Sequence, residues 1–447
     1  MIVMLQATVN FAQPAGRVKP MHAVNNGPIY PWHSDQCITN FDAYRAAGIP
    51  FARTHDSSFC ASYGGEHTVD VHAIFPDFDR DPADPNAYDF TVTDMYLQTI
   101  ALAGTEPFYR LGSKIEHGPK KYGTLPPRDF YKWAQVCEHI IRHYTEGWAN
   151  GPKMKITYWE IWNEPDLDAD DSPNKRCWGG TEKQFYELYD VTARHLKACF
   201  PQLKIGGPAL AYHTDWMERF LAQLTAPLDF FSWHIYATDP ERVAARAREV
   251  RACLDRHGFT QTESILNEWN YVRSFEGEAW YYSLKQEKSL KGAAYIAAVM
   301  AKCQVAPVDL LMYYDARPCG MNGMFNTDFV CECLKGYYPF PMFNELYTLG
   351  DSCAVKSDSS HAYLCAARRG DQAAVMLSCF REDDDAADDT IVLNLRGFAD
   401  GDVRAECLLL DETHDMVPVR AEWVSGANGA LTLPAPRNAV WLIRLKK

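Results

Sequence analysis

The sequence predicts an α/β protein: a (β/α)8 TIM barrel with an appended antiparallel β-sandwich domain. Two observations predict it. Up to Gly350, runs of β-branched and aromatic residues alternate with segments that carry apolar residues at helical spacing, which is typical of repeated βα units around a parallel sheet. After Gly350 the runs become short and alternating and are broken by Gly and Asp, as in antiparallel strands.

Eight candidate barrel strands can be counted, and each is followed by a candidate helix. The strands are residues 18–24, 49–56, 106–112, 156–165, 203–210, 229–237, 264–270 and 310–317. The helices are residues 41–47, 92–103, 129–145, 181–199, 215–224, 240–256, 291–303 and 343–349. Several begin at Asp or Thr and end near Gly, which suits helix caps. A doubly wound open sheet is the alternative, but no Gly-x-Gly-x-x-Gly follows an early strand.

The sandwich is predicted from residues 361–368, 372–379, 390–395, 404–410 and 439–445. We therefore divide the chain into a barrel over residues 15–349 and a sandwich over residues 350–447, with residues 1–14 as a candidate extra strand of the sandwich. The acidic run 382–389 is expected to be a solvated loop rather than a metal site.

The charge and hydropathy of the chain exclude several classes of partner. Its 44 Lys and Arg against 58 Asp and Glu give a net charge of −14, which repels nucleic acid and anionic membranes. No run reaches the roughly 18 apolar residues of a membrane span, and the N-terminus lacks the basic and apolar regions of a signal peptide. We expect a cytoplasmic protein, although a secreted protein trimmed of its signal would look the same.

The 14 cysteines are scattered along the chain, as expected of reduced thiols in the cytoplasm. Cys331 and Cys333, with Cys319 nearby, are the nearest approach to a zinc motif, and Cys-x-Cys alone is a weak one. No metal and no cofactor are predicted.

Polar residues lie at the C-terminal ends of the expected strands, where barrel enzymes carry their catalytic groups. They are Asn25, Asn26, Arg53, His55, Arg110, Asn163, Glu164, His234, Tyr236, Glu268, Asn270, Tyr314 and Asp315. Each alone is commonly a hydrogen-bonded core residue, but two carboxylates among Arg, His, Asn and Tyr predict a catalytic pocket. Two such carboxylates catalyse glycoside hydrolysis, with retention when they lie about 5–5.5 Å apart.

Three motifs carry a family resemblance: Asn163-Glu164-Pro165, Ser-Trp-His-Ile-Tyr at 232–236 and Leu-Asn-Glu-Trp-Asn at 266–270. They resemble the retaining glycoside hydrolases of clan A, in particular family 39, which includes β-xylosidases and α-L-iduronidases. The likeness extends to residues 19–28, 51–55, 335–338 and 346–350. It implies a barrel with an appended β-sandwich.

The resemblance also implies roles. Glu164 would be the general acid/base, Glu268 the nucleophile, and Asn163 would contact the 2-hydroxyl of the sugar. The remaining substrate-binding candidates are Arg53, His55, His234 and Tyr236. An Arg or Tyr donor would keep Glu268 ionised, whereas Glu164, flanked by aromatic residues, would stay protonated.

The eighth strand departs from the family pattern. Family xylosidases resemble Tyr-Trp-Thr-Phe-Ser-Asp followed by acidic residues, whereas residues 312–319 read Met-Tyr-Tyr-Asp-Ala-Arg-Pro-Cys. Tyr314 stands in the place of a Trp, and Arg317 lies where the acidic pair would be, so both are candidate substrate-binding residues. Arg317 would favour a sugar acid or another pentose, or pair with Asp315, and the pairing is favoured.

The expected function is therefore a retaining exo-glycosidase that removes a terminal pentose from a glycoside, with β-xylosidase first and α-L-arabinosidase or uronidase next. A non-catalytic carbohydrate-binding barrel is the alternative from another class, and the presence of both Glu164 and Glu268 argues against it. A metal-dependent hydrolase would need ligands such as His55, His234 and Asp315, and activity that survives EDTA would exclude it. The oligomeric state is left open.

Overall fold

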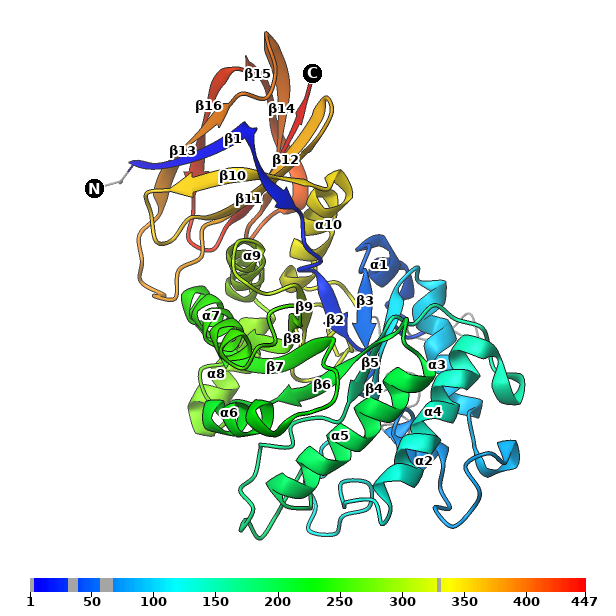
Figure 1. Ribbon diagram of the computed structural model, residues 1–447. Coiled ribbons are helices and arrows are strands. Elements are labelled where there is room, and N and C mark those ends of the chain that lie inside the picture. The colour runs from blue at the N-terminus through cyan, green and yellow to red at the C-terminus, as the bar shows by residue number, and fades with distance from the viewer. Residues whose placement is uncertain (1–3, 31–38, 57–66, 328–330) are drawn as a thin grey trace.

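The computed structural model describes residues 4–30, 39–56, 67–327 and 331–447. A barrel with helices around it lies below a large sheet, and the helices α9 and α10 lie between the two (Figure 1). The eight parallel barrel strands close in the order β2 to β9, so the predicted barrel is confirmed.

The barrel strands are β2 (Ala23–Asn25), β3 (Phe51–Arg53), β4 (Glu106–Leu111), β5 (Tyr158–Ile161), β6 (Lys204–Leu210), β7 (Phe230–Ala237), β8 (Glu263–Tyr271) and β9 (Leu310–Tyr313). Four expected strands were too long, since the predictions of 18–24 and 49–56 exceed β2 and β3 as well as the two that follow. The prediction of 156–165 overran β5 because Trp162 (φ 76°) and Glu164 (φ 47°) leave the extended backbone conformation, which removes them from the ladder. The prediction of 310–317 overran β9, since the chain turns after Tyr313.

The helices are α1 (Phe41–Ala46), α2 (Val71–Ile74), α3 (Thr91–Leu102), α4 (Phe130–Glu146), α5 (Glu182–Cys199), α6 (Thr214–Gln223), α7 (Pro240–Arg256), α8 (Gly277–Glu287), α9 (Leu290–Gln304) and α10 (Pro339–Leu349). All eight expected helices are among them, and α2 and α8 are additional. The side chain of Asp129 caps α4 by accepting from the backbone N–H of Lys132, and Thr181 forms a capping box at the start of α5, as the sequence pattern indicated.

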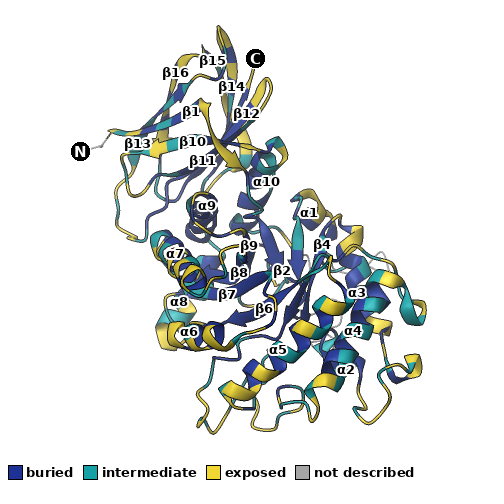
Figure 2. Cartoon of the chain, in the orientation of Figure 1, coloured by how far each residue is buried: buried dark blue, intermediate teal, exposed yellow. Residues whose placement is uncertain are grey.

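The burial of the barrel elements follows their place in the fold. Helices α5, α6 and α7 show an exposed outer face and a buried face towards the strands (Figure 2). Inside the barrel, the layer of side chains towards the N-terminal ends of the strands is apolar. It consists of Ala23, Phe108, Phe230, Ile265, Leu310 and Met312. This layer closes the N-terminal end of the barrel, so the polar residues at the C-terminal ends of the strands stand on an apolar floor.

The sheet has nine strands in the order β15-β14-β17-β12-β11-β10-β1-β13-β16. They are β1 (Met4–Arg17), β10 (Asp351–Ser357), β11 (Tyr363–Arg369), β12 (Gln372–Ser378), β13 (Asp389–Arg396), β14 (Asp402–Leu410), β15 (Asp415–Ser425), β16 (Asn428–Ala435) and β17 (Val440–Lys446). The predicted second β-structure is confirmed with one correction: β1 and β13 are parallel, so this sheet is mixed rather than wholly antiparallel. The division of the chain at residues 15 and 350 stays a prediction.

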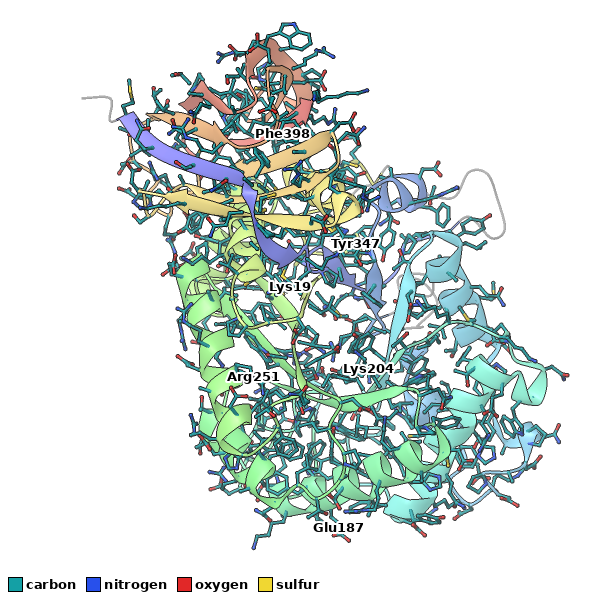
Figure 3. All side chains as sticks on the ribbon, turned by 45° about the horizontal axis from the view of Figure 1, so that its top comes forward. Lys19, Glu187, Lys204, Arg251, Tyr347 and Phe398 are labelled. Carbon is teal, nitrogen blue, oxygen red and sulfur yellow. The ribbon has the colours of Figure 1, made fainter. Side chains whose placement is uncertain are left out.

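Strand β1 connects the two parts of the molecule. It pairs antiparallel with β10, and immediately after this pairing the backbone N–H of Val18 donates to the carbonyl oxygen of Gly350 (2.9 Å). Near this point Lys19, labelled at the junction of sheet and barrel in Figure 3, donates to the carbonyl oxygens of Ala306 and Val308 (2.7 Å each). The point where the chain enters the barrel, at residue 18, therefore lies beside the point where it leaves the barrel, at residue 350.

The acidic run 382–389 connects β12 to β13 and is mostly exposed, as expected of a solvated loop, but two of its carboxylates also bind residues of the barrel. Glu382 accepts hydrogen bonds from Tyr271 (2.9 Å) and Arg273 (2.7 Å), and Asp384 pairs with Lys291 (2.8 Å). Lys291 is buried in α9, so the run supplies the counter-charge that a buried ammonium requires. The run thus connects the sheet to the C-terminal end of β8.

No helix in the described part of the chain is long and apolar enough to cross a membrane. The described cysteines are all free thiols.

Candidate active site

Glu164 reaches the mouth of the barrel on a short irregular segment beyond β5. The backbone N–H of Trp162 donates to Leu111 in β4 (2.6 Å), and that of Glu164 donates to Ala209 in β6 (2.9 Å). These bonds tie the segment to the strands on both sides. The side chain of Glu164 is 14% exposed at the mouth, whereas Glu268 projects from within β8 and is 7% exposed.

The two carboxyl groups face each other across the mouth. One carboxylate oxygen of Glu164, one of Glu268 and a ring nitrogen of His234 all lie within 4.8 Å of one another. Nδ1 of His234 is 2.8 Å from Oε1 of Glu164 and 3.5 Å from Oε2 of Glu268. Carboxylate oxygens this close suit the narrow spacing of about 5–5.5 Å between two catalytic carboxyl groups.

Glu268 is held by strong donors. Nη1 of Arg53 donates to its Oε1 (2.8 Å), and the hydroxyl of Tyr236 donates to its Oε2 (2.9 Å). Nε2 of His55 lies 3.5 Å from the same Oε1. Burial raises the pKa of Glu268, while His234, Arg53 and the Tyr236 hydroxyl act in the opposite direction. The guanidinium of Arg53 and the hydroxyl of Tyr236 stabilise the ionised carboxylate.

Glu164 has weaker partners. Besides His234 it contacts the thiol of Cys177, with Sγ 3.7 Å from Oε2. Burial raises the pKa of Glu164, and the positive groups near it oppose that shift from a distance. Burial also lowers the pKa of His234, so this ring is a neutral neighbour. The environments of the two carboxyls thus differ. Glu268 is paired with a guanidinium, whereas Glu164 contacts a thiol and a neutral imidazole.

Arg53 is hydrogen-bonded to several polar residues of the site. Its Nε donates to Glu160 in β5 (2.6 Å), and its Nη2 donates to Oδ1 of Asn163 (2.7 Å). Arg53 and Glu160 are both fully buried, and such a pair is stable only when each partner is satisfied. Because Oδ1 of Asn163 accepts from Arg53, the donor that this side chain can offer to a ligand is its amide nitrogen.

The predicted residues Tyr314 and Arg317 lie in a second cluster, centred on Asp56. The hydroxyl of Tyr314 donates to Asp56 (2.9 Å), while Lys114 and Arg317 form ion pairs with it (2.9 and 3.1 Å). Arg317 also pairs with Asp315 at 3.2 Å, so the favoured interpretation of this arginine is confirmed. The Tyr314 ring meets His55 edge to face at 5.8 Å, which links the second cluster to the first.

The charges of this second cluster are balanced locally. Burial alone would raise the pKa of Asp56, but His55, Arg317 and Lys114 together hold it well below its ordinary value. Burial raises the pKa of Asp315 to about 6 and lowers the pKa of His55 to about 4. His55 is therefore neutral at neutral pH, and Asp56 is the anion that Tyr314 and Arg317 bind.

The other polar residues at the strand ends form hydrogen bonds and ion pairs within the barrel itself. The amide of Asn25 donates to the carbonyl of Asn267 (2.7 Å), and Asn26 accepts from the backbone of Asp56 (2.7 Å). Arg110 lies outside the catalytic cluster, because it forms a buried ion pair with Asp70 (2.6 Å). The structure thus brings together seven of the predicted site residues around the two carboxyls, which are Arg53, His55, Asn163, Glu164, His234, Tyr236 and Glu268.

Residues 61–319, more than half of the chain, match the family model described as Glycosyl hydrolases family 39. The chain belongs to glycosyl hydrolase family 39. Among curated relatives of this family 39 chain, the β-xylosidase of Geobacillus stearothermophilus is 27% identical over 214 residues, which are 41% of this chain and 41% of the relative. The β-xylosidase of Caldicellulosiruptor saccharolyticus is 25% identical over 267 residues, 57% of this chain and 52% of the relative. The chain thus spans about half or less of the length of these relatives.

Solved structures share the fold of the family 39 chain over its whole length. A glucosidase from Croceicoccus marinus has a TM-score of 0.81 at 23% identity and covers 100% of this chain and 99% of its own. A family 39 β-xylosidase from Caulobacter crescentus has a TM-score of 0.68 at 20% identity and covers 99% of this chain and 100% of its own. These matches support the combination of barrel and β-sandwich.

Several residues of the family 39 site were missed from the sequence, namely Asp56, Lys114, Glu160 and Cys177. For Glu160 a signal existed, because a carboxylate inside an otherwise apolar strand needs a buried counter-charge. Asp56 was the last residue of the expected second strand, so it too could have been included. Cys177 lies 13 residues after Glu164, in the long loop between β5 and α5, and nothing in the local pattern points to it.

Proposed function

We propose that the chain is a retaining exo-glycosidase that releases a terminal pentosyl residue, with β-xylosidase as the favoured activity. The observation that carries the proposal is the pair of carboxyl groups, with oxygens of Glu164 and Glu268 within 4.8 Å and unequal partners. Family membership and the two β-xylosidase relatives support it.

In the first step, a carboxylate oxygen of Glu268 attacks the anomeric carbon. The bond from that carbon to the leaving oxygen breaks, and Glu164 delivers its proton to the leaving oxygen. In the second step, the ionised Glu164 takes a proton from water, and the water oxygen attacks the anomeric carbon. The ester bond to Glu268 breaks, which restores both carboxyls and retains the configuration.

The other residues near the carboxyls bind and orient. Arg53 and Tyr236 hold Glu268 in place and in its charged form, and the free amide donor of Asn163 suits a contact with the sugar 2-hydroxyl. His55 and His234 stand beside the carboxyls as neutral rings able to bind sugar hydroxyls. Tyr314 and Arg317 belong to the second cluster, where both bind Asp56.

The alternatives differ in the sugar. α-L-Arabinosidase activity remains the second candidate on the same carboxyl geometry. A uronidase would need a cation for the sugar carboxylate, and the rim cations Lys114 and Arg317 are both paired with Asp56, which counts against it. A non-catalytic barrel has no need of two carboxyls with such different partners. Since a glucosidase shares the fold, glucosides belong in the test panel.

The test is hydrolysis of aryl β-xyloside, α-L-arabinoside, β-glucoside and α-L-iduronide, with the anomer of the first-formed product read by NMR. We expect the xyloside to react fastest, with retention and without inhibition by EDTA. An inverted product, or no hydrolysis of any substrate by the folded protein, would overturn the proposal.

Two variants separate the roles of the carboxyls. Glu268→Ala should be inactive and should form a glycosyl azide when azide is supplied as a nucleophile. Glu164→Ala should lose far more rate on poor leaving groups than on activated aryl ones, because only the former need protonation. Glu263→Ala is the matched control: it lies at the opposite end of β8, paired with Lys204, and should keep its activity.

A further inference from the structure

Two clusters of possible metal ligands lie on the outer helices of the barrel, away from the mouth. The first joins α4 and α5, which lie side by side in Figure 1. Nε2 of His195 is 2.7 Å from Oε2 of Glu138 and 3.9 Å from Sγ of Cys199. One ligand atom from each of the three residues lies within 4.8 Å of the others.

The second cluster joins α6 and α7 and consists of Glu218, Cys253 and His257. Nε2 of His257 is 2.6 Å from Oε2 of Glu218, and the three ligand atoms again lie within 4.8 Å of one another. In both clusters the second helix supplies a Cys and a His four residues apart, which places them on one face a turn apart. The preceding helix supplies the Glu.

The clusters also share a way of orienting the carboxylate. Oε1 of Glu138 accepts from Nε of Arg142 (2.8 Å), so that only Oε2 faces His195. Oε1 of Glu218 likewise accepts from Arg256, while its Oε2 faces His257. Carboxylate ligands of metal ions are held in this manner by hydrogen bonds from a surrounding residue.

We propose that each cluster binds one divalent ion of the zinc class. Thiolate, imidazole and carboxylate are the ligands that zinc prefers, with water as the fourth ligand of an open tetrahedral site. Bonds of about 2.0–2.3 Å place such ligand atoms roughly 3.3–3.6 Å apart, so in the first cluster His195 and Glu138 must move apart and Cys199 must move closer to His195. On binding, each cysteine loses its proton to solvent, and one proton is released per ion.

The first site is open to the ion. The side chains of Glu138 and His195 are 14% and 15% exposed, so an ion can enter without opening the barrel. Each cluster holds one cysteine, and its Glu lies 57 or 39 residues before its His, which is why the cysteine spacing predicted no metal. Each ion would join neighbouring helices of successive βα units, independently of the proposed catalysis.

The experiment is a titration of the metal-free, reduced full chain with Co²⁺, which gives a thiolate-to-cobalt absorption band when cysteine is a ligand. We expect a band that Zn²⁺ abolishes by displacement. Cys199→Ser and Cys253→Ser should each remove about half of it, and the double variant all of it. The other two clusters of this kind among the described residues, Glu164 with His234 and Glu268, and His67 with Asp70 and His72, contain no thiol.

His139→Gln, which changes a histidine of α4 beside the first cluster, is the control and should keep the full band. His195→Gln and His257→Gln replace the serine variants if those fail to fold, and circular dichroism reports folding. No band in the folded wild-type protein with excess Co²⁺, a band that depends on only one of the two cysteines, or a band that survives in the double variant would overturn the proposal.

Discussion

Tyr236→Phe tests the assignment of Glu268 as the ionised nucleophile. The substitution removes one hydroxyl, whose hydrogen bond to Oε2 of Glu268 is 2.9 Å long. The ion pair between Arg53 and Oε1 at 2.8 Å remains, so the carboxylate keeps its charged partner. The variant therefore changes one donor and little else.

The size of the effect follows from the bond that is lost. A hydrogen bond to a charged group contributes about 1.5–3 kcal/mol, and at about 1.4 kcal/mol per factor of ten its loss lowers kcat/KM by about 10- to 150-fold. The bond to Tyr236 lowers the pKa of Glu268, so its removal raises that pKa. The acid limb of the pH profile should therefore move to higher pH.

The assay is kcat/KM for an aryl glycoside as a function of pH. In the proposed mechanism, activity requires the carboxylate form of Glu268, so a higher pKa moves the acid limb to higher pH. Tyr295→Phe is the matched control, because its buried hydroxyl has no hydrogen-bond partner among the described residues. An acid limb that stays in place, or moves to lower pH, would refute the role given to the pair Tyr236 and Glu268.

Three further substitutions test other parts of the structure. Cys177→Ala removes a contact that lowers the pKa of Glu164, so the alkaline limb of kcat/KM should move to higher pH, and an unchanged limb would exclude a positioning role. Burial raises the pKa of Glu287 from 4.5 to about 8, so the native state keeps a proton that the unfolded state releases and stability falls as pH rises between these values. In Glu287→Gln this fall should be absent from urea unfolding at about pH 5 and about pH 8. Gly207→Ala should cost about 1–3 kcal/mol in urea unfolding, because its Cβ would lie 2.6 Å from a backbone oxygen of β5 and force a shift; Gly104→Ala, also at positive φ but in open space, should cost less.

Sequence reasoning located the long elements of the barrel because their hydrophobic periodicity is strong. It missed α2, which has only four residues, α8, which buries only Ser283 and Glu287, and the sheet strands β10, β15 and β16, of which β15 is mostly exposed. A strand with little burial shows no alternation of apolar and polar residues, and a single helical turn shows no period. The parallel pairing of β1 with β13 joins residues 4–10 to residues 390–396, and no local sequence pattern carries that information.

The site was predicted to the extent that it lies at strand ends. Glu164 and Glu268 were found because parallel strands of a barrel deliver their C-terminal residues to one mouth. Arg317 was left with three interpretations, since its partner depends on how the chain turns after β9. Cys177 could not be found at all, because a loop brings it to Glu164 from outside the strand pattern.

The pairing of β1 with β10 gives the molecule the connectivity of a domain insertion. Residues 18–350 leave one strand of an antiparallel pair and return to the next, so the whole barrel occupies the place of a hairpin loop. The entropic cost of closing a loop rises only with the logarithm of its length, but here the ends meet only once the barrel has folded. Both partners of β1 come after residue 350, so a chain that ended at residue 349 would present β1 with both edges unpaired, a template for aggregation.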